Sequence, residues 1–258
     1  PQNFLLNNLL RFPQAKSANA IYGTLIHTVL QHAHSHLAAS GTRKPIEDIT
    51  GEFIRLLHQQ ELSDNDLALY SKRGIEALEA FLSAKYDTFK PSQKPELSFA
   101  GQGVVLGQAR LTGSLDLVDI DNQTITVTDY KTGKPSTSWT GKSDYEKIKL
   151  HKYRQQLMFY ELLCANSRDY AKYDFGGAVL QFVEPDSRGD ICQLDDRFSR
   201  DELADFQRLI AAVWRCITTL ELPDISNYQA SYQGMIQFEE DLLAGKYPAC
   251  EQPKTGDE

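Results

Sequence analysis

Residues 111–133 read LTGSLDLVDIDNQTITVTDYKTG, and the rest of the chain can be arranged around them. Apolar and polar residues alternate over residues 111–120 and again over residues 124–131, which predicts two short β-strands. Asp121 and Asn122 stand between the two strands, where a hairpin turn needs residues that tolerate a positive φ. The stretch therefore predicts a β-hairpin.

The predicted hairpin carries Asp116 and Asp129, and Lys131 follows Asp129 by two positions. Because side chains alternate between the faces of a strand, a loop with an even number of residues places all three on one face. A two-residue loop sets Asp116 opposite Val127, a four-residue loop sets it opposite Asp129, and an odd loop without a bulge sends it to the other face. Carboxylates and an ammonium on one face suggest a Mg²⁺ or Mn²⁺ site with a lysine that holds water or a phosphate oxygen. The alternative is a buried salt bridge, or acids that merely end strands.

Composition narrows the classes of protein to consider. A chain of 258 residues buries roughly 70–75% of its unfolded surface, so it needs no disulfide or metal to fold. The net charge of −8 does not favour nucleic-acid binding, which therefore requires a local basic patch. The four cysteines form no C-x-x-C pair, which argues against zinc ribbons and clustered iron–sulfur motifs and fits a reduced cytosolic compartment. No apolar run approaches the ~20 residues of a membrane span and no signal peptide is visible, so we expect no membrane partner.

Periodicity and capping signals predict the other elements on both sides of the hairpin. Three helices and then a strand that pairs onward through Gly107 are expected before it, over residues 20–39, 46–60, 63–86 and 96–106. A Gly/Ser/Thr/Pro-rich loop, a helix, two strands and two helices are expected after it, over residues 132–144, 145–166, 175–184, 190–194, 199–220 and 235–244. This order predicts an α/β core with helical additions at both ends.

Residues 131–154 form a basic window in this acidic chain, with seven basic residues, two acids and a net charge of +5. Trp139, Tyr145 and Tyr153 are interleaved with the charges. Lysine and arginine bind the phosphate backbone, and unpaired bases stack on aromatic rings, so the window suggests DNA binding. The alternative is a solvated helix face beside a charged loop. The residues expected to contact DNA are Lys134, Lys149, Lys152 and Arg154.

Four histidines in the helix predicted over residues 20–39 could suggest a metal cluster. At about 100° per residue only His27 and His34 share a face, so the four do not form one site. We expect His32, His34 and His36 to lie on a solvated or half-buried surface.

Five short motifs occur in order and together resemble the RecB-like branch of the PD-(D/E)XK nucleases. They are GTLIH at Gly23–His27, Glu96, GSLD at Gly113–Asp116, DYKTG at Asp129–Gly133 and QLMFY at Gln156–Tyr160. They match that family's G-x-x-x-H, G-x-x-D, D-Y-K-T-G and Q-x-x-x-Y patterns and span residues 20–165. Residues 4–27 also resemble the entry to the nuclease domain at the C-terminal end of UvrD-type helicases. The chain lacks an initiator Met, so we expect a fragment of a longer helicase–nuclease.

The resemblance implies a role for each matching residue. The implied metal ligands are His27, Asp116, Asp129 and the carbonyl of Tyr130. Lys131 would position the attacking water and stabilise charge that develops on the phosphate. The metal would lower the pKa of its water and neutralise the phosphate, contributing several kcal/mol each way. The supporting residues would be Gln156 and Tyr160, which also contact DNA, and Glu96 as a secondary site residue.

The resemblance also implies a restriction-endonuclease-like fold, a central mixed β-sheet flanked by helices. We expect one nuclease domain over residues 1–258, with an N-terminal helical part at 1–90, the catalytic sheet and DNA-facing helix at 91–195, and C-terminal helices at 196–258. Several relatives hold an iron–sulfur cluster with cysteines at both ends of this domain. Here only Cys250 lies near an end, so we expect no cluster.

The implied function is Mg²⁺- or Mn²⁺-dependent DNA cleavage, as an exonuclease that is fed by helicase motor domains in repair or recombination at the bacterial nucleoid. No G-x-x-x-x-G-K-[ST] motif occurs, so we expect no ATPase motor in this chain. One alternative is a nuclease-fold module of a helicase that binds DNA or a partner protein without cutting. Another is a metal enzyme that acts on small phosphoesters.

Overall fold

A five-stranded mixed sheet forms the centre of the computed structural model, which describes residue 7 and residues 15–246. Its strands, in spatial order, are β1 (Lys94–Ser98), β4 (Ser114–Asp121), β5 (Thr124–Lys131), β6 (Asp174–Pro185) and β7 (Ile191–Asp196). β5 and β6 are parallel, and the other neighbours are antiparallel. The predicted mixed sheet is confirmed, although β4 begins three residues later than expected.

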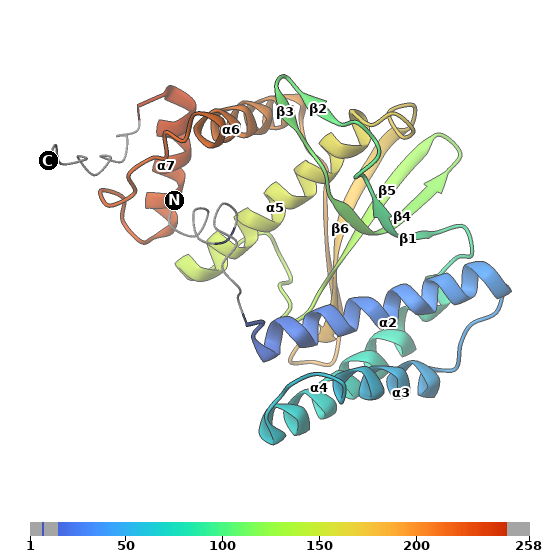
Figure 1. Ribbon diagram of the computed structural model, residues 1–258. Coiled ribbons are helices and arrows are strands. Elements are labelled where there is room, and N and C mark those ends of the chain that lie inside the picture. The colour runs from blue at the N-terminus through green and yellow to red at the C-terminus, as the bar shows by residue number, and fades with distance from the viewer. Residues whose placement is uncertain (1–6, 8–14, 247–258) are drawn as a thin grey trace, which may run out of the picture.

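Helices cover both faces of the sheet (Figure 1). One layer contains α2 (Ala18–Ser40), α3 (Ile46–Leu57) and α4 (Asp64–Lys85). Their apolar side chains share a core with Leu117 of β4, Tyr130 of β5 and Val183 of β6. The other layer contains α5 (Asp144–Ala165), which packs on the opposite face of the same strands. Beside α5 lie the last two helices, α6 (Arg200–Thr219) and α7 (Tyr232–Ala244). All six predicted helices are confirmed, each to within three residues at either end.

The start of α5 is fixed by a capping box. The Ser143 hydroxyl accepts a hydrogen bond from the backbone N–H of Glu146 at 3.2 Å, and the Glu146 carboxylate accepts one from the backbone N–H of Ser143 at 3.3 Å. Such reciprocal bonds satisfy N–H groups that the first turn of a helix leaves without partners. Because the helix phase is set here, residues of α5 spaced three or four apart face the sheet together.

The hairpin turn consists of residues 122–123, one position later than expected, and Asn122 adopts a φ of 53° there. Continuing the antiparallel ladder by one residue places Asp116 opposite Asp129 and not opposite Val127. The loop has an even number of residues, so the expectation that Asp116 shares a face with Asp129 and Lys131 is confirmed. The turn expected at Asp121–Asn122 is wrong by one residue. The register equals the one that we expected from a four-residue loop.

The expected continuous strand over residues 96–106 is wrong. After β1 the chain turns away, and β2 (Val105–Leu106) and β3 (Ala109–Arg110) make a small separate hairpin. Gly103 lies two residues before β2 with a φ of 66°, and Gly107 lies in the turn between β2 and β3 with a φ of 58°, conformations that glycine tolerates at little cost. β1 itself pairs directly with β4.

The histidines of α2 occupy different environments. His32 is exposed, as expected, but His34 is 1% exposed, so its expected place on the surface is wrong. Its ring stacks on Phe89 at 3.7 Å between centroids, and its Nε2 atom lies 2.8 Å from the Tyr130 hydroxyl. Burial lowers the pKa of His34 to about 4.

The buried His34 should make the protein less stable in mild acid. The pKa of this group is lower in the folded state, at about 4, than its ordinary value of 6.5, so the unfolded state binds more protons between these values. Stability is therefore retained above about pH 6.5 and is lost as the pH falls toward 4. Urea unfolding should show that His34 lowers the free energy of unfolding by about 1 kcal/mol as the pH falls from about 7.5 to about 5.5. His34→Gln should abolish that part of the pH dependence and His36→Gln should retain it; equal pH profiles for both variants would contradict the assignment.

Candidate catalytic and metal site

The first half of the site joins strand β5 to helix α5. Asp129 Oδ1 accepts hydrogen bonds from Gln156 Nε2 at 3.0 Å and from the Tyr160 hydroxyl at 2.7 Å. Lys131 Nζ lies 2.7 Å from Asp129 Oδ2 and donates a hydrogen bond to Gln156 Oε1 at 2.7 Å. Four residues that were singled out in the sequence therefore form one connected network.

The second half of the site joins strands β1 and β4 to helix α2. Asp116 Oδ2 accepts a hydrogen bond from the backbone N–H of Tyr130 at 2.8 Å and lies 3.2 Å from His27 Nδ1. Glu96 is half-buried on β1, and its register with β4 places it beside Asp116. Potential ligand atoms of His27, Glu96 and Asp116 all lie within 4.8 Å of one another.

The backbone at Glu96 is unusual, since its φ is 48° in the middle of a strand. Non-glycine residues rarely adopt this region, and such strain persists only where the surrounding structure imposes it. The structure brings the Glu96 carboxylate close to the carboxylate of Asp116 and the imidazole of His27.

The donor set fits a hard divalent cation. Asp129 is 2% exposed, and its Oδ2 atom accepts no hydrogen bond among the described residues, although the Lys131 ammonium lies 2.7 Å away as its ion-pair partner. A carboxylate oxygen carries two lone pairs, so Oδ2 has one left for a cation beside the ammonium. Three carboxylates and one imidazole form an oxygen-rich set that suits Mg²⁺ or Mn²⁺ better than a soft metal. Asp129 lies outside the tight group of three, so its part as a ligand stays a prediction.

Electrostatics in the site also favour a bound cation. Burial raises the pKa of Asp129, although the Lys131 ammonium opposes this. Burial and then the charge of Asp116 raise the pKa of Glu96. Burial favours neutral His27, but the hydrogen bond and charge of Asp116 outweigh it and raise the pKa of His27. Negative charges crowded in a confined space repel each other, and a divalent cation would offset that repulsion.

Tyr153 is a site residue that the sequence did not assign. Lys131 Nζ lies 4.7 Å from the centroid of its ring, within reach of a cation–π interaction. Tyr153 precedes Gln156 by three residues and Tyr160 by seven, so all three share the face of α5 that meets the sheet. That spacing is the sequence signal that could have identified it.

Glu184 and Arg73 hold the chain just after Lys131, and neither was predicted. The Glu184 carboxylate accepts hydrogen bonds from Arg73 Nη2 and from the backbone N–H of Gly133, both at 2.7 Å. It also accepts one from the Tyr22 hydroxyl at 3.2 Å. Gly133 has a φ of 96°, so this bond fixes a sharp turn two residues beyond Lys131. No local pattern signals the pair, because Arg73 and Glu184 are 111 positions apart.

The four residues expected to contact DNA fall into different settings. Lys134 and Lys152 are exposed. Lys149 is half-buried and donates a hydrogen bond to the Lys134 carbonyl at 3.0 Å, so it also anchors the loop after β5.

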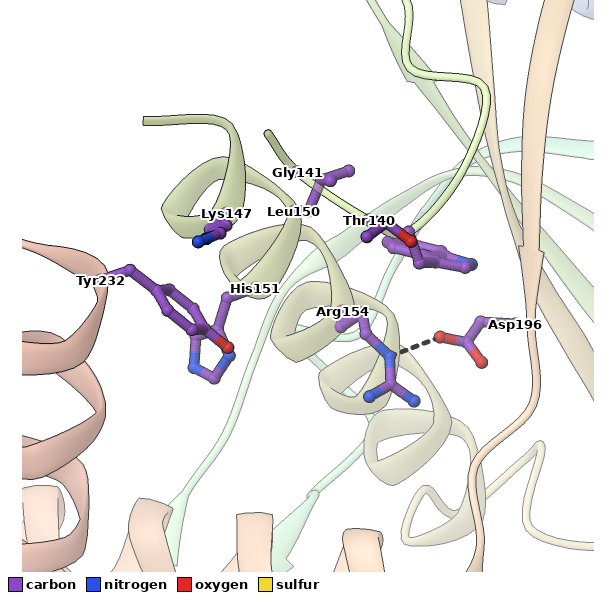
Figure 2. Close-up of a pocket in the computed structure, with 9 residues that line it drawn as sticks. Thr140, Gly141, Lys147, Leu150, His151, Arg154, Asp196 and Tyr232 are labelled. Atoms are coloured by element: carbon purple, nitrogen blue, oxygen red, sulfur yellow. Dashed lines mark hydrogen bonds and ion pairs between the residues drawn. The ribbon is translucent and has the colours of Figure 1, made fainter. Parts of the chain in front are cut away.

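Arg154 lies on another face of α5, where it lines a cavity of about 470 Å³ (Figure 2). Its guanidinium pairs with Asp196 at 2.7 Å and with Glu202 at 3.0 Å. In the same cavity His151 lies beside Tyr232 of α7, with ring centroids 6.1 Å apart. Arg154 thus connects α5 to β7 and α6, and its contact with DNA stays a prediction.

A comparison with protein-family models agrees with these features. A family model described as the PD-(D/E)XK nuclease superfamily matches residues 1–232, which include every site residue described above. One matching solved structure, titled "Crystal structure of SSO0001", is 12% identical, covers 82% of this chain and 87% of its own, and has a TM-score of 0.31. No curated protein matches the sequence.

Proposed function

The chain belongs to the PD-(D/E)XK nuclease superfamily, and on that basis we propose that it hydrolyses phosphodiester bonds in DNA with the help of Mg²⁺ or Mn²⁺. The observation that carries this proposal is the buried Asp129, with one oxygen free of hydrogen bonds among the described residues and with Lys131 in contact. A structural salt bridge would not require Glu96, Asp116 and His27 to converge beside it.

Each residue then has a chemical task. The metal would be held by His27, Asp116, Asp129 and the Tyr130 carbonyl, with Glu96 near enough to join. When bound, a divalent metal lowers the pKa of its water and offsets charge on the phosphate.

Lys131 would hold the attacking water and stabilise negative charge that develops on the phosphate oxygens. Gln156 and Tyr153 keep its ammonium in place, through a hydrogen bond of 2.7 Å and a ring contact at 4.7 Å. Tyr160 orients Asp129 from the opposite side. Such positioning is a large part of catalysis of phosphoryl-group reactions, because reacting groups must be held in line.

More specifically, we propose that the protein is an exonuclease. It would work with the motor domains of a helicase in DNA repair or recombination, in the bacterial cytoplasm. This proposal is supported by the order of the five motifs and by the resemblance of residues 4–27 to the helicase–nuclease junction. Among the residues that the structure describes, no helix combines the length and apolar character needed to cross a bilayer. Cys250 lies outside the described residues, so the expected lack of an iron–sulfur cluster stays a prediction.

An exonuclease should degrade linear single-stranded DNA and leave a closed circle of the same sequence intact, because only the linear molecule has an end. Both substrates carry the same phosphodiester chemistry, so the circle is a matched control. The measurement is a time course on denaturing gels with Mg²⁺ or Mn²⁺. Cutting of the circle at the same rate as the linear form would replace the exonuclease proposal with an endonuclease.

The second candidate function is a module that binds DNA without cutting it. The features in its favour are the basic loop and the exposed Lys134 and Lys152. Loss of activity in a degenerate domain would usually remove a ligand or the lysine, whereas here Asp116, Asp129 and Lys131 are all in place. Salt-sensitive DNA binding without cleavage under any metal condition would favour this candidate.

A further inference from the structure

We propose that a cleft beside the catalytic site holds the phosphate backbone of a single DNA strand next to the bond that is cut. The cleft lies between the loop at residues 134–142 and the β6–β7 turn at residues 185–188, and has a volume of about 940 Å³. This inference rests on the proposed nuclease function and names the part of the substrate that the neighbouring surface binds.

The cleft opens directly beside the catalytic lysine. Glu184 and Arg73 line the cleft, and Glu184 accepts the hydrogen bond from the backbone N–H of Gly133. Gly133 follows Lys131 by two residues. A strand that passes Lys131 toward this side therefore enters the cleft with its next phosphates.

The carboxylates that line the cleft are already engaged. Glu146 accepts hydrogen bonds from the backbone N–H groups of Lys142, at 2.9 Å, and Ser143, at 3.3 Å. Asp186 Oδ1 accepts two more from backbone N–H groups, at 2.8 and 3.0 Å, in the β6–β7 turn. Glu184 pairs with Arg73. Each of the three acids is thus held by the protein's own backbone or by an arginine, and the four cations that line the cleft exceed the acids by one.

The exposed cations of the cleft form no close ion pair with acids of the described chain, although Glu146 interacts electrostatically with Lys134 and Lys142, and Asp186 with Arg188. Lys134, Lys142 and Arg188 are exposed, and none of them forms an ion pair within the part of the chain that the structure describes. Unpaired lysine and arginine groups on two sides of a cleft attract a polyanion and release its counterions on binding. The cleft is therefore suited to an anionic ligand even though the chain as a whole has a net charge of −8.

The remaining lining selects the DNA backbone over the bases. Hydroxyl groups and backbone atoms line the cleft, and none of its described lining residues carries an aromatic ring on which a base could stack. Hydroxyls, lysines, arginines and backbone N–H groups are the usual partners of phosphates, whereas bases require stacking or edge contacts. The hydroxyl-bearing residues are Ser136, Thr137, Ser138, Thr140 and Ser187. The volume is in the range of sites that hold one ligand, which accommodates a short run of phosphates from one strand.

The cleft is held open by fixed contacts. A Cβ atom added at Gly141 would lie 2.5 Å from the backbone nitrogen of Lys147, so the loop reaches α5 more closely than other residues allow. Lys149 binds the carbonyl of Lys134 at the other end of the loop. A binding surface that is already formed loses little conformational entropy when the ligand arrives.

The test is the binding of a single-stranded oligonucleotide by Lys142→Gln/Arg188→Gln, in an Asp129→Asn background that prevents cleavage. Both positions are exposed, so the variant should fold normally. We expect affinity to fall on the order of 10-fold and the slope of log K against log salt to shrink by about 1.4, because each phosphate that the protein no longer neutralises removes about 0.7 from the slope. The matched control Arg55→Gln/Arg110→Gln removes two exposed cations outside the cleft and should leave both quantities unchanged.

Oligonucleotides with one neutral methylphosphonate linkage at successive positions locate the contacts. Neutral linkages on one side of the scissile bond should weaken binding to the Asp129→Asn protein and should cost less in the triple variant. In the active enzyme, Lys142→Gln/Arg188→Gln should raise KM and leave kcat within about twofold, because neither residue touches the reacting atoms. If the variant has the same salt slope as the control, or the same loss of affinity for neutral linkages as the Asp129→Asn protein, the proposal that this cleft binds DNA is wrong. The nuclease proposal still stands in that case, provided that the wild type cuts DNA. A wild type that neither binds nor cuts DNA would overturn both.

Discussion

Asp129→Asn should lower DNA cleavage at least about 100-fold, which corresponds to about 2.7 kcal/mol of transition-state stabilisation. Asn keeps the shape of the side chain and one oxygen that can accept the hydrogen bonds from Gln156 and Tyr160. It lacks the charged Oδ2 that contacts Lys131 and that has no hydrogen bond of its own among the described residues. The variant should therefore lose metal affinity and should keep its fold.

Two measurements separate these effects. Initial rates on end-labelled DNA should be measured over a range of Mn²⁺ concentrations. The variant should need more Mn²⁺ to reach half of its maximum rate, and that maximum rate should be lower. Circular dichroism and thermal unfolding should report an intact fold. Full activity of Asp129→Asn would refute the assignment of this site.

Lys131→Ala should also lower cleavage at least about 100-fold, through loss of charge stabilisation on the phosphate. The ammonium is held by Asp129, by Gln156 and by the ring of Tyr153, so its position is fixed before substrate binds. Unlike Asp129→Asn, this change removes no oxygen ligand. Metal binding should therefore persist while turnover is lost.

The matched control is Lys152→Ala, which removes an exposed lysine from the same helix as Gln156 and Tyr160. It should change DNA affinity and its salt dependence more than kcat, because a phosphate contact acts mainly on binding. Isothermal titration with Mn²⁺ and single-turnover rates distinguish the two lysines. If Lys131→Ala and Lys152→Ala have the same moderate effect on KM alone, Lys131 has no catalytic role.

The hairpin could be predicted because its information is local. Alternation placed Asp129 and Lys131 on one face, and Asp116 with them if the loop was even; the four-residue spacing placed Gln156 and Tyr160 on one side of a helix. The structure confirms that all of these except Asp116 form a single hydrogen-bonded network. Asp116 lies opposite Asp129 across the hairpin.

The parts that were missed depend on tertiary contacts or on the conformation that a glycine adopts. Residues 96–106 alternate well enough to suggest a strand, but the chain leaves the sheet after Ser98, and Gly107 makes the turn of the separate β2–β3 hairpin. His34 is buried because Phe89, 55 positions along the chain, covers its ring. Neither the alternation of a strand nor the periodicity of a helix could predict that the chain leaves the sheet or that His34 is buried.

The same holds for the site itself. Glu96 enters it only because the chain adopts a positive φ there and because β1 pairs with β4. Glu184 enters it because β6 lies parallel to β5 and ends beside Gly133. Sequence patterns within one element do not reveal which residues of other elements will come into contact.

The most direct test of the central claim is cleavage of end-labelled single- and double-stranded DNA with Mg²⁺, with Mn²⁺ or with EDTA, beside Asp129→Asn. The account predicts product fragments from the wild type with either metal, none with EDTA, and at least about 100-fold fewer from the variant. Cleavage that persists in EDTA, or that is equal in the wild type and Asp129→Asn, would contradict a metal-dependent nuclease built on Asp129.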